Sequence, residues 1–140
     1  MKENALQPVK LSNQVLMPDS PNKDQQSRIQ RFINWLDMMN LVWHSIPSLQ
    51  PYAYYLQREG KIRGDGRGLA PATINAHLST IRSRYRALVN DMGIRSQLME
   101  ATRKAADQSD QVQTFADIKG VVDEIYLRLE RGIIQSPVKA

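Results

Sequence analysis

The sequence predicts an all-α protein: a bundle of four core helices followed by a further C-terminal helix. Apolar residues recur at intervals of three and four through most of the 140 residues, as they do on the buried side of a helix. No segment alternates apolar and polar residues as a half-buried strand does, and proline, glycine and serine fall where the apolar rows break. A chain of this length corresponds to about one domain.

The first helix follows a polar N-terminal stretch. Residues 1–18 show no periodicity and include two prolines, which predicts a flexible arm. Ser20 suits the N-cap and Pro21 the first helical position, where its missing N–H costs nothing. The helix is expected to end near Met39. Its expected buried residues are Ile29, Phe32, Ile33 and Leu36.

A short second helix follows a break in the pattern at residues 40–47, where Trp43 is expected to fold inward as a plug. Ser48 starts this helix, which tolerates Pro51 in its first turn. Residues 60–68 contain four glycines and predict a loop. The expected buried residues of the second helix are Leu49, Tyr52, Ala53 and Leu56.

The third helix has the strongest pattern. It starts at Pro71, a good first-turn residue, and Gly93 is expected to end it at the C′ position. Its apolar residues step by four and three, so they fall in one row on the helix. The row is Ile74, Leu78, Ile81, Tyr85, Leu88 and Met92.

Two more helices complete the predicted fold. One runs from about residue 96 to 107 and turns Leu98, Thr102 and Ala105 inward; after a polar stretch, the last runs over about 115–131. The bundle is therefore expected at residues 19–107. Residues 108–140 are expected to form a linker and a less firmly attached C-terminal helix. The apolar side of that helix is Phe115, Ile118, Val122, Ile125 and Leu129.

Composition argues against most kinds of chemistry. The chain has no cysteine and only two histidines, His44 and His77, so disulfides and a zinc site are not expected. No serine stands in a nucleophile elbow and no carboxylate pair lies beside a histidine. We expect no catalytic site, no cofactor, no small-molecule substrate and no membrane association. No apolar run approaches the roughly 20 residues of a spanning helix, which predicts a cytoplasmic protein.

The net charge of +5 is concentrated in one segment. Residues 58–86 hold seven basic and two acidic residues, while acidic and basic residues cancel over the rest of the chain. Such clustering is typical of a protein that binds a polyanion; the alternative is a solvated basic surface. The basic residues of the segment are Arg58, Lys61, Arg63, Arg67, Arg82, Arg84 and Arg86.

Polar side chains of the third helix form two stripes that we expect to make one DNA-binding face. Serine, threonine, asparagine and arginine bond phosphate oxygens and base edges, and no acidic residue occurs between Gly66 and Asn90. The loop before the helix adds Lys61, Arg63 and Arg67, either as a phosphate clamp or as a mobile solvated loop. The stripes are Asn75, Ser79, Arg82 and Arg86, and Thr73, His77, Thr80 and Arg84.

Three stretches of the chain carry a family resemblance. Residues 68–93, residues 31–36 and residues 52–56 are similar, in order and spacing, to the N-terminal core-binding domain of tyrosine recombinases (phage integrases). The resemblance covers about residues 20–107. It implies a SAM-like bundle that clamps one side of duplex DNA. The residues that it implies at the DNA are Thr73, Asn75, Ser79, Arg82 and Arg86.

The recombinase reaction is not implied. The family's catalysis needs an arginine, a lysine, a His-x-x-Arg element and a tyrosine in a further domain, whereas Pro47 and Thr80 stand three residues after the two histidines. We therefore expect a non-enzymatic, nucleoid-associated module in DNA integration or recombination, either independent or part of a recombinase. The alternatives are a protein-interaction module that meets recombinase protomers through residues 115–129, and a basic surface that touches anionic membranes.

Overall fold

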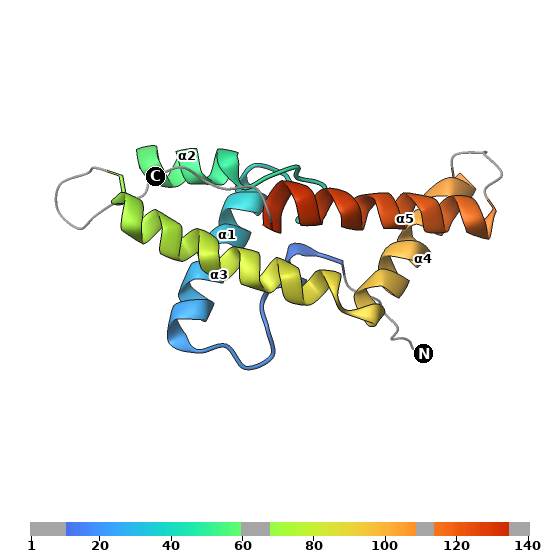
Figure 1. Ribbon diagram of the computed structural model, residues 1–140, viewed down its shortest axis with the longest axis horizontal. Helices are drawn as coiled ribbons and strands as arrows, with labels where there is room; N and C mark the ends of the chain where they lie inside the picture. Colours follow the sequence, from blue (N-terminus) through green and yellow to red (C-terminus); the bar gives the residue numbers. More distant parts are fainter. Residues whose placement is uncertain (1–10, 60–67, 109–113, 135–140) are drawn as a thin grey trace.

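The computed structural model describes residues 11–59, 68–108 and 114–134 and is helical throughout, with no strand in this part of the chain (Figure 1). The predicted all-α class is confirmed. The elements in chain order are the 3₁₀ helix η1 (Asn13–Leu16), α1 (Lys23–Met38), α2 (Gln50–Glu59), α3 (Pro71–Val89), α4 (Met92–Gln108), α5 (Phe115–Leu129) and the π-helical turn η2 (Glu130–Ile134).

Helix α3 is the central element of the bundle. It contacts α1, α2, α4, α5, η1 and η2, and it crosses the molecule between the other helices (Figure 1). Its buried row is the predicted one except at its last member, since Met92 belongs to α4 and is 74% exposed. The buried residues of α3 are Ile74, Leu78, Ile81, Tyr85 and Leu88.

Trp43 fills the middle of the core, as predicted. It is 0% exposed, and its ring packs edge-on against Tyr85 with the centroids 5.7 Å apart. The Tyr85 hydroxyl donates a 2.6 Å hydrogen bond to the Trp43 carbonyl, and the Trp43 indole N–H donates to the carbonyl of Leu11. The loop between α1 and α2, which has no regular structure, is thereby fixed to the centre of α3.

Two predicted helix ends are wrong. Helix α1 is capped by Asn22, not Ser20, and the Asn22 and Gln25 side chains form a reciprocal capping box. Helix α3 ends at Val89 with Asn90 as its C-cap, whereas Gly93 lies inside the first turn of α4. In each case a capping residue close to the predicted one, Asn22 or Asn90, marks the end of the helix, so the predicted end is off by two or three residues.

The expectation of a flexible arm over residues 1–18 is wrong for residues 11–18. Leu16 is buried in the core. The amide of the buried Asn13 donates to Asp37 and to the carbonyl of Leu41, and its oxygen accepts from the Trp43 N–H. This N-terminal strap, residues 11–18, therefore ties the end of α1 to the following loop.

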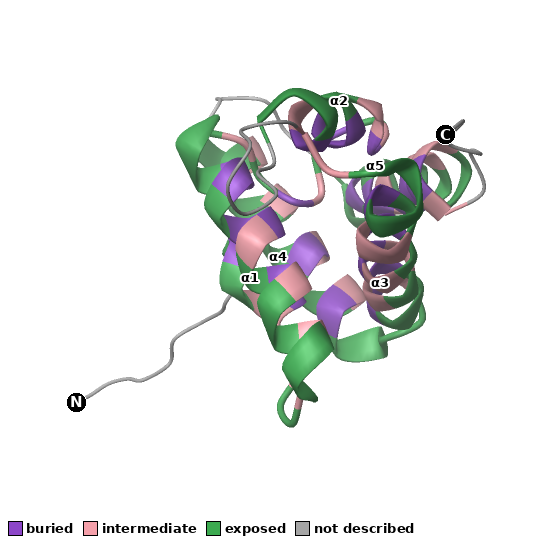
Figure 2. Cartoon of the chain, turned by 90° about the vertical axis from the view of Figure 1, so that its left-hand side faces the viewer, coloured by how far each residue is buried: buried purple, intermediate pink, exposed green. Residues whose placement is uncertain are grey.

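Helix α5 packs into the same core as the other helices. It is therefore part of the bundle that was expected at residues 19–107, and not a loosely attached helix beside it. Val122, Tyr126 and Leu129 lie in the same apolar cluster as buried residues of α1 and α3. Figure 2 shows buried positions on α1, α3 and α5. Phe115, predicted on the buried side, is 70% exposed. Ala105 of α4, also predicted inward, is exposed.

A close backbone approach fixes the end of α5 to the loop after α1. A side-chain carbon at Gly132 would stand only 1.8 Å from the carbonyl oxygen of Pro47. Only a residue without a side chain fits there. The contact holds η2 against the loop that precedes α2, while Ile133 of η2 is buried in the core.

Candidate nucleic-acid interface

The outward side of α3 carries small polar residues and one arginine. Among the described residues α3 contains no carboxylate, and its first turn has neither an acidic residue nor a side-chain cap at Ala70. The helix dipole therefore adds positive potential at the start of a helix that is already basic. The exposed residues of α3 are Pro71, Ala72, Thr73, Asn75, Ser79, Ser83, Arg86 and Ala87.

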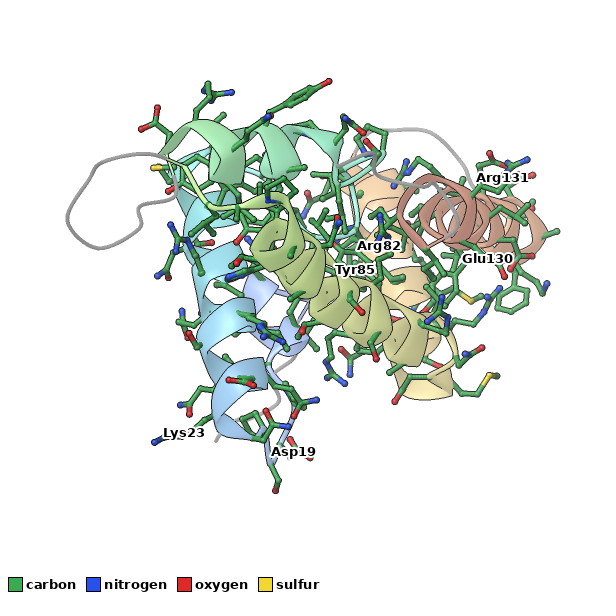
Figure 3. The ribbon with its side chains drawn as sticks, turned by 60° about the vertical axis from the view of Figure 1, so that its left-hand side comes forward. Asp19, Lys23, Arg82, Tyr85, Glu130 and Arg131 are labelled. Atoms are coloured by element: carbon green, nitrogen blue, oxygen red, sulfur yellow. The ribbon has the colours of Figure 1, made fainter. Side chains whose placement is uncertain are left out.

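The two polar stripes of α3 lie on opposite flanks of the helix and do not form the single face expected. Arg82 and Arg84 are two positions apart, so their side chains leave the helix in directions that differ by about 200° around its axis. The Nε of Arg82 donates to the carbonyl of Ile133 in η2 at 3.2 Å, and Figure 3 shows this side chain on the side of α3 toward α5. The Nε of Arg84 donates to the carbonyl of Leu16, at 2.7 Å, in the N-terminal strap.

Arg82 and Arg84 therefore hold the fold as well as carrying charge. Arg84 makes a second bond, from Nη2 to the carbonyl of Val15 at 3.1 Å. Burial lowers the pKa of both guanidinium groups, helped at Arg82 by the charge of Arg86 and opposed at Arg84 by Asp19 and Asp91. Since an arginine starts from a very high pKa, both remain charged near neutral pH. Neither has the conformational freedom of an exposed arginine.

We expect Arg84→Ala to lower the free energy of unfolding by about 2 kcal/mol, because two partly buried carbonyls of the strap lose a charged donor. Urea unfolding followed by circular dichroism measures the change. Arg86→Ala, on the same helix and exposed, is the matched control and should alter stability by less than about 0.5 kcal/mol. Equal effects of the two substitutions would contradict a structural role for Arg84.

The other predicted site residues fall into three groups. Asn75, Ser79 and Arg86 are exposed on the flank of Arg82, and Thr73 is exposed on the other flank. His77 is only partly exposed and faces α1, whose arginines influence it. The three basic loop residues, Lys61, Arg63 and Arg67, lie outside the described residues.

Two arginines of α1, Arg28 and Arg31, interact with polar residues of α3 but were not among the predicted site residues. The Nη1 of Arg28 donates a 3.1 Å hydrogen bond to the hydroxyl of Thr80. Burial lowers the pKa of His77, and the charges of Arg31 and Arg28 lower it further. Arg28 and Arg31 are spaced by three residues beside the apolar row of α1, and that spacing was the available signal.

His44 has a packing role, in line with its position beside Trp43. Its ring meets the Trp43 ring edge-on at 5.2 Å, and its carbonyl accepts a hydrogen bond from Arg128. Burial and the charge of Arg128 lower its pKa. Within the described ranges no three acidic, histidine or cysteine side chains come together as a metal site would require, and no described helix is long and apolar enough to cross a membrane.

Comparison with known proteins identifies no relative. No protein-family model matches the chain, and neither a curated protein nor a solved structure matches it.

Proposed function

We propose that this chain binds duplex DNA as a non-catalytic module of the tyrosine-recombinase core-binding type, acting in DNA integration or recombination. The observation that carries the proposal is the outward side of α3, which presents small polar residues and Arg86 with no carboxylate among them. Such a protein would reside with the nucleoid in the cytoplasm. The SAM-like arrangement of the helices is part of the same proposal.

Small side chains suit this role because they allow a helix to approach the sugar-phosphate backbone closely. Ser79 and Ser83 can donate hydroxyl hydrogen bonds to phosphate oxygens. Asn75 and Arg86, on the same flank, are of the types that pair with adenine and guanine edges. Arg82 adds charge from beside them while its Nε remains bound to η2. The contacts are therefore expected to be mostly to phosphate.

The test is fluorescence anisotropy with a labelled random-sequence duplex at two salt concentrations. Each phosphate contact contributes about −0.9 to the slope of log K against log salt. Arg86→Ala is expected to weaken binding and to flatten this slope by about one. Arg103→Ala on α4, where the arginine pairs with Glu100, removes the same charge and should leave the slope unchanged. Identical slopes for wild type and Arg86→Ala would reject this surface.

A second candidate is association with recombinase protomers through residues 115–129. Ile118 and Val122, two of the five residues on the predicted apolar side of this helix, are buried in the protein's own core. The observation that favours an interface is the apolar exposure that remains on α5, at Phe115, Val121 and Leu127. A chain that elutes as a monomer on gel filtration, and does so unchanged when recombinase protomers are added, would contradict association through this helix.

A further inference from the structure

A hollow of about 340 Å³ lies between the N-terminal strap, α1 and α3. Most of its lining comes from α3, and this lining, which consists of described residues, contains no carboxylate. The side chains that line it are therefore apolar, neutral and polar, or cationic. They are Pro18, Gln25, Ile29, Ser79, Thr80, Ser83, Arg84 and Ala87.

Arg84 is the charged residue of this lining, and the fold holds it in place. Its Nε donates to the carbonyl of Leu16 at 2.7 Å and its Nη2 donates to the carbonyl of Val15 at 3.1 Å. Within the described ranges its third nitrogen, Nη1, makes no hydrogen bond. A guanidinium that is already fixed by two bonds loses little conformational freedom when a further donor binds an anion.

Gln25 is fixed in a similar way on the α1 side of the hollow. Its Oε1 accepts a 3.0 Å hydrogen bond from the backbone N–H of Asn22 in the capping box, which sets the orientation of the amide. The Nε2 of the same amide has no partner in the part of the chain that the structure describes. Gln25 therefore offers a donor of defined orientation.

The hydroxyl groups of α3 complete the set of donors. Ser79 and Ser83 are one turn apart and exposed, and neither hydroxyl is bonded to another described residue. The hydroxyl of Thr80 is already used, because it donates to the carbonyl of Ala76 and accepts a 3.1 Å bond from Nη1 of Arg28. Arg28 does not line the hollow, but this bond holds its positive charge against a residue that does.

The acidic residues that influence Arg84 lie outside the lining. The charges of Asp19 and Asp91 act on Arg84, but in the described parts of the chain neither forms an ion pair with it. Asp19 lies near Lys23 at the start of α1 (Figure 3). The positive charge of Arg84 is therefore weakened from a distance and is not neutralised by a direct contact.

We propose that this hollow is a binding site for a phosphate group, which accepts hydrogen bonds from four of the lining side chains. Arginine and small hydroxyl residues are types that bind phosphate oxygens. The volume falls at the lower end of the roughly 300–1,000 Å³ of small-molecule sites, so a phosphate fits together with the sugar that carries it. The donors are Gln25, Ser79, Ser83 and Arg84.

The site adds an anchoring point to the proposed DNA surface, and to that extent it rests on the proposed function. Ser79 and Ser83 belong to the outward side of α3. A DNA strand that follows α3 would therefore place one phosphate over the hollow, between α3 and the start of α1. The same donors would serve a small phosphorylated molecule, so phosphate binding by itself does not depend on that function.

The first experiment titrates the full chain with inorganic phosphate and follows it by two-dimensional ¹H–¹⁵N NMR. The reporters are the Nε–H of Arg84 and the backbone amides of residues 79–87, with the amides of residues 98–108 as the internal reference. Sodium chloride at equal ionic strength controls for screening. We expect saturable shifts at the reporters with phosphate and not with chloride. Equal shifts with both salts, or shifts spread over the reference amides, would overturn the site.

The variant that tests the hollow itself is Gln25→Glu. It keeps an oxygen to accept from Asn22, and glutamate is a usual residue at this place in a capping box, so the start of α1 is preserved. The change replaces the Nε2 donor by a carboxylate oxygen and should weaken phosphate binding by at least about tenfold. Gln26→Glu makes the same charge change at the next, exposed position outside the hollow, and should weaken binding by less than about twofold. Equal losses would reject the hollow as the place of binding.

Duplex DNA separates the two sources of phosphate, with anisotropy as the readout for the same two variants. A loss of about tenfold in DNA affinity with Gln25→Glu, and not with Gln26→Glu, identifies the DNA backbone as the source. Equal DNA affinities of the two variants, together with phosphate binding that only Gln25→Glu weakens, identify a small phosphorylated molecule. If neither ligand distinguishes the variants, the site is rejected even when DNA binds through Arg86. Phosphate binding at the hollow without any DNA binding would reject the proposed function and leave the site.

Discussion

Replacing Trp43 by alanine is expected to lower the free energy of unfolding by about 3–5 kcal/mol. The indole is wholly buried and packs against the rings of Tyr85 and His44. Its N–H is bonded to Leu11 in the N-terminal strap. Alanine would leave a cavity and would also leave the Leu11 carbonyl without its donor. The strap, the loop after α1 and the centre of α3 would lose their common contact.

Chemical denaturation followed by circular dichroism measures this effect. The matched control is Tyr54→Ala, because Tyr54 is a large aromatic residue that is 51% exposed on α2. Its removal should change stability by less than about 1 kcal/mol. A Trp43→Ala protein that unfolds at nearly the wild-type denaturant concentration would contradict the central role assigned to this side chain.

The helical core could be predicted because its signal is local. In α3 the apolar row from Ile74 to Leu88 repeats over about four turns, and a pattern of that length has few other interpretations. Tyr54, out of step with the buried residues of α2, is exposed as the pattern suggests. Trp43 was predictable for a different reason: a large apolar side chain in a short break between helices has few other places to go.

The N-terminal strap and α5 could not be placed from the sequence. The 3₁₀ turn at residues 13–16 is too short to show a period, and its main attachment is the amide of Asn13, whose partners lie at Asp37, Leu41 and Trp43. Hydrogen bonds between segments that are distant in the sequence cannot be recognised from composition or periodicity. The apolar side of α5 was visible, but a periodic row does not indicate whether it packs on its own bundle or on another chain.

The candidate site was predicted only in part, because the sequence gives the position of an arginine on a helix but not its partner. The spacing of Arg82 and Arg84 already placed them on different flanks of α3. Their bonds to Ile133 and Leu16 arise only when η2 and the strap fold onto α3. Arg28 belongs to the site for the same reason, since tertiary packing brings α1 against Thr80.

Replacing both Ser79 and Ser83 by glutamate is expected to reduce DNA affinity about 100-fold, or about 2.8 kcal/mol. Both serines are exposed on the outward side of α3, so the folded state can accommodate the longer side chains. Two carboxylates there would repel phosphates, and a glutamate at position 83 would also pair with Arg86 one turn later. The same anisotropy titration measures the loss.

The control for this variant keeps its charge change and moves it elsewhere. Ser27→Glu on α1 together with Ser96→Glu on α4 adds two carboxylates at exposed positions outside α3. Long-range repulsion from net charge alone would weaken both double variants to the same degree, and would do so less at high salt. Contact along α3 predicts instead a loss confined to the Ser79 and Ser83 variant. Equal losses would mean that the chain attracts DNA by its overall charge and that α3 is not the surface that meets it.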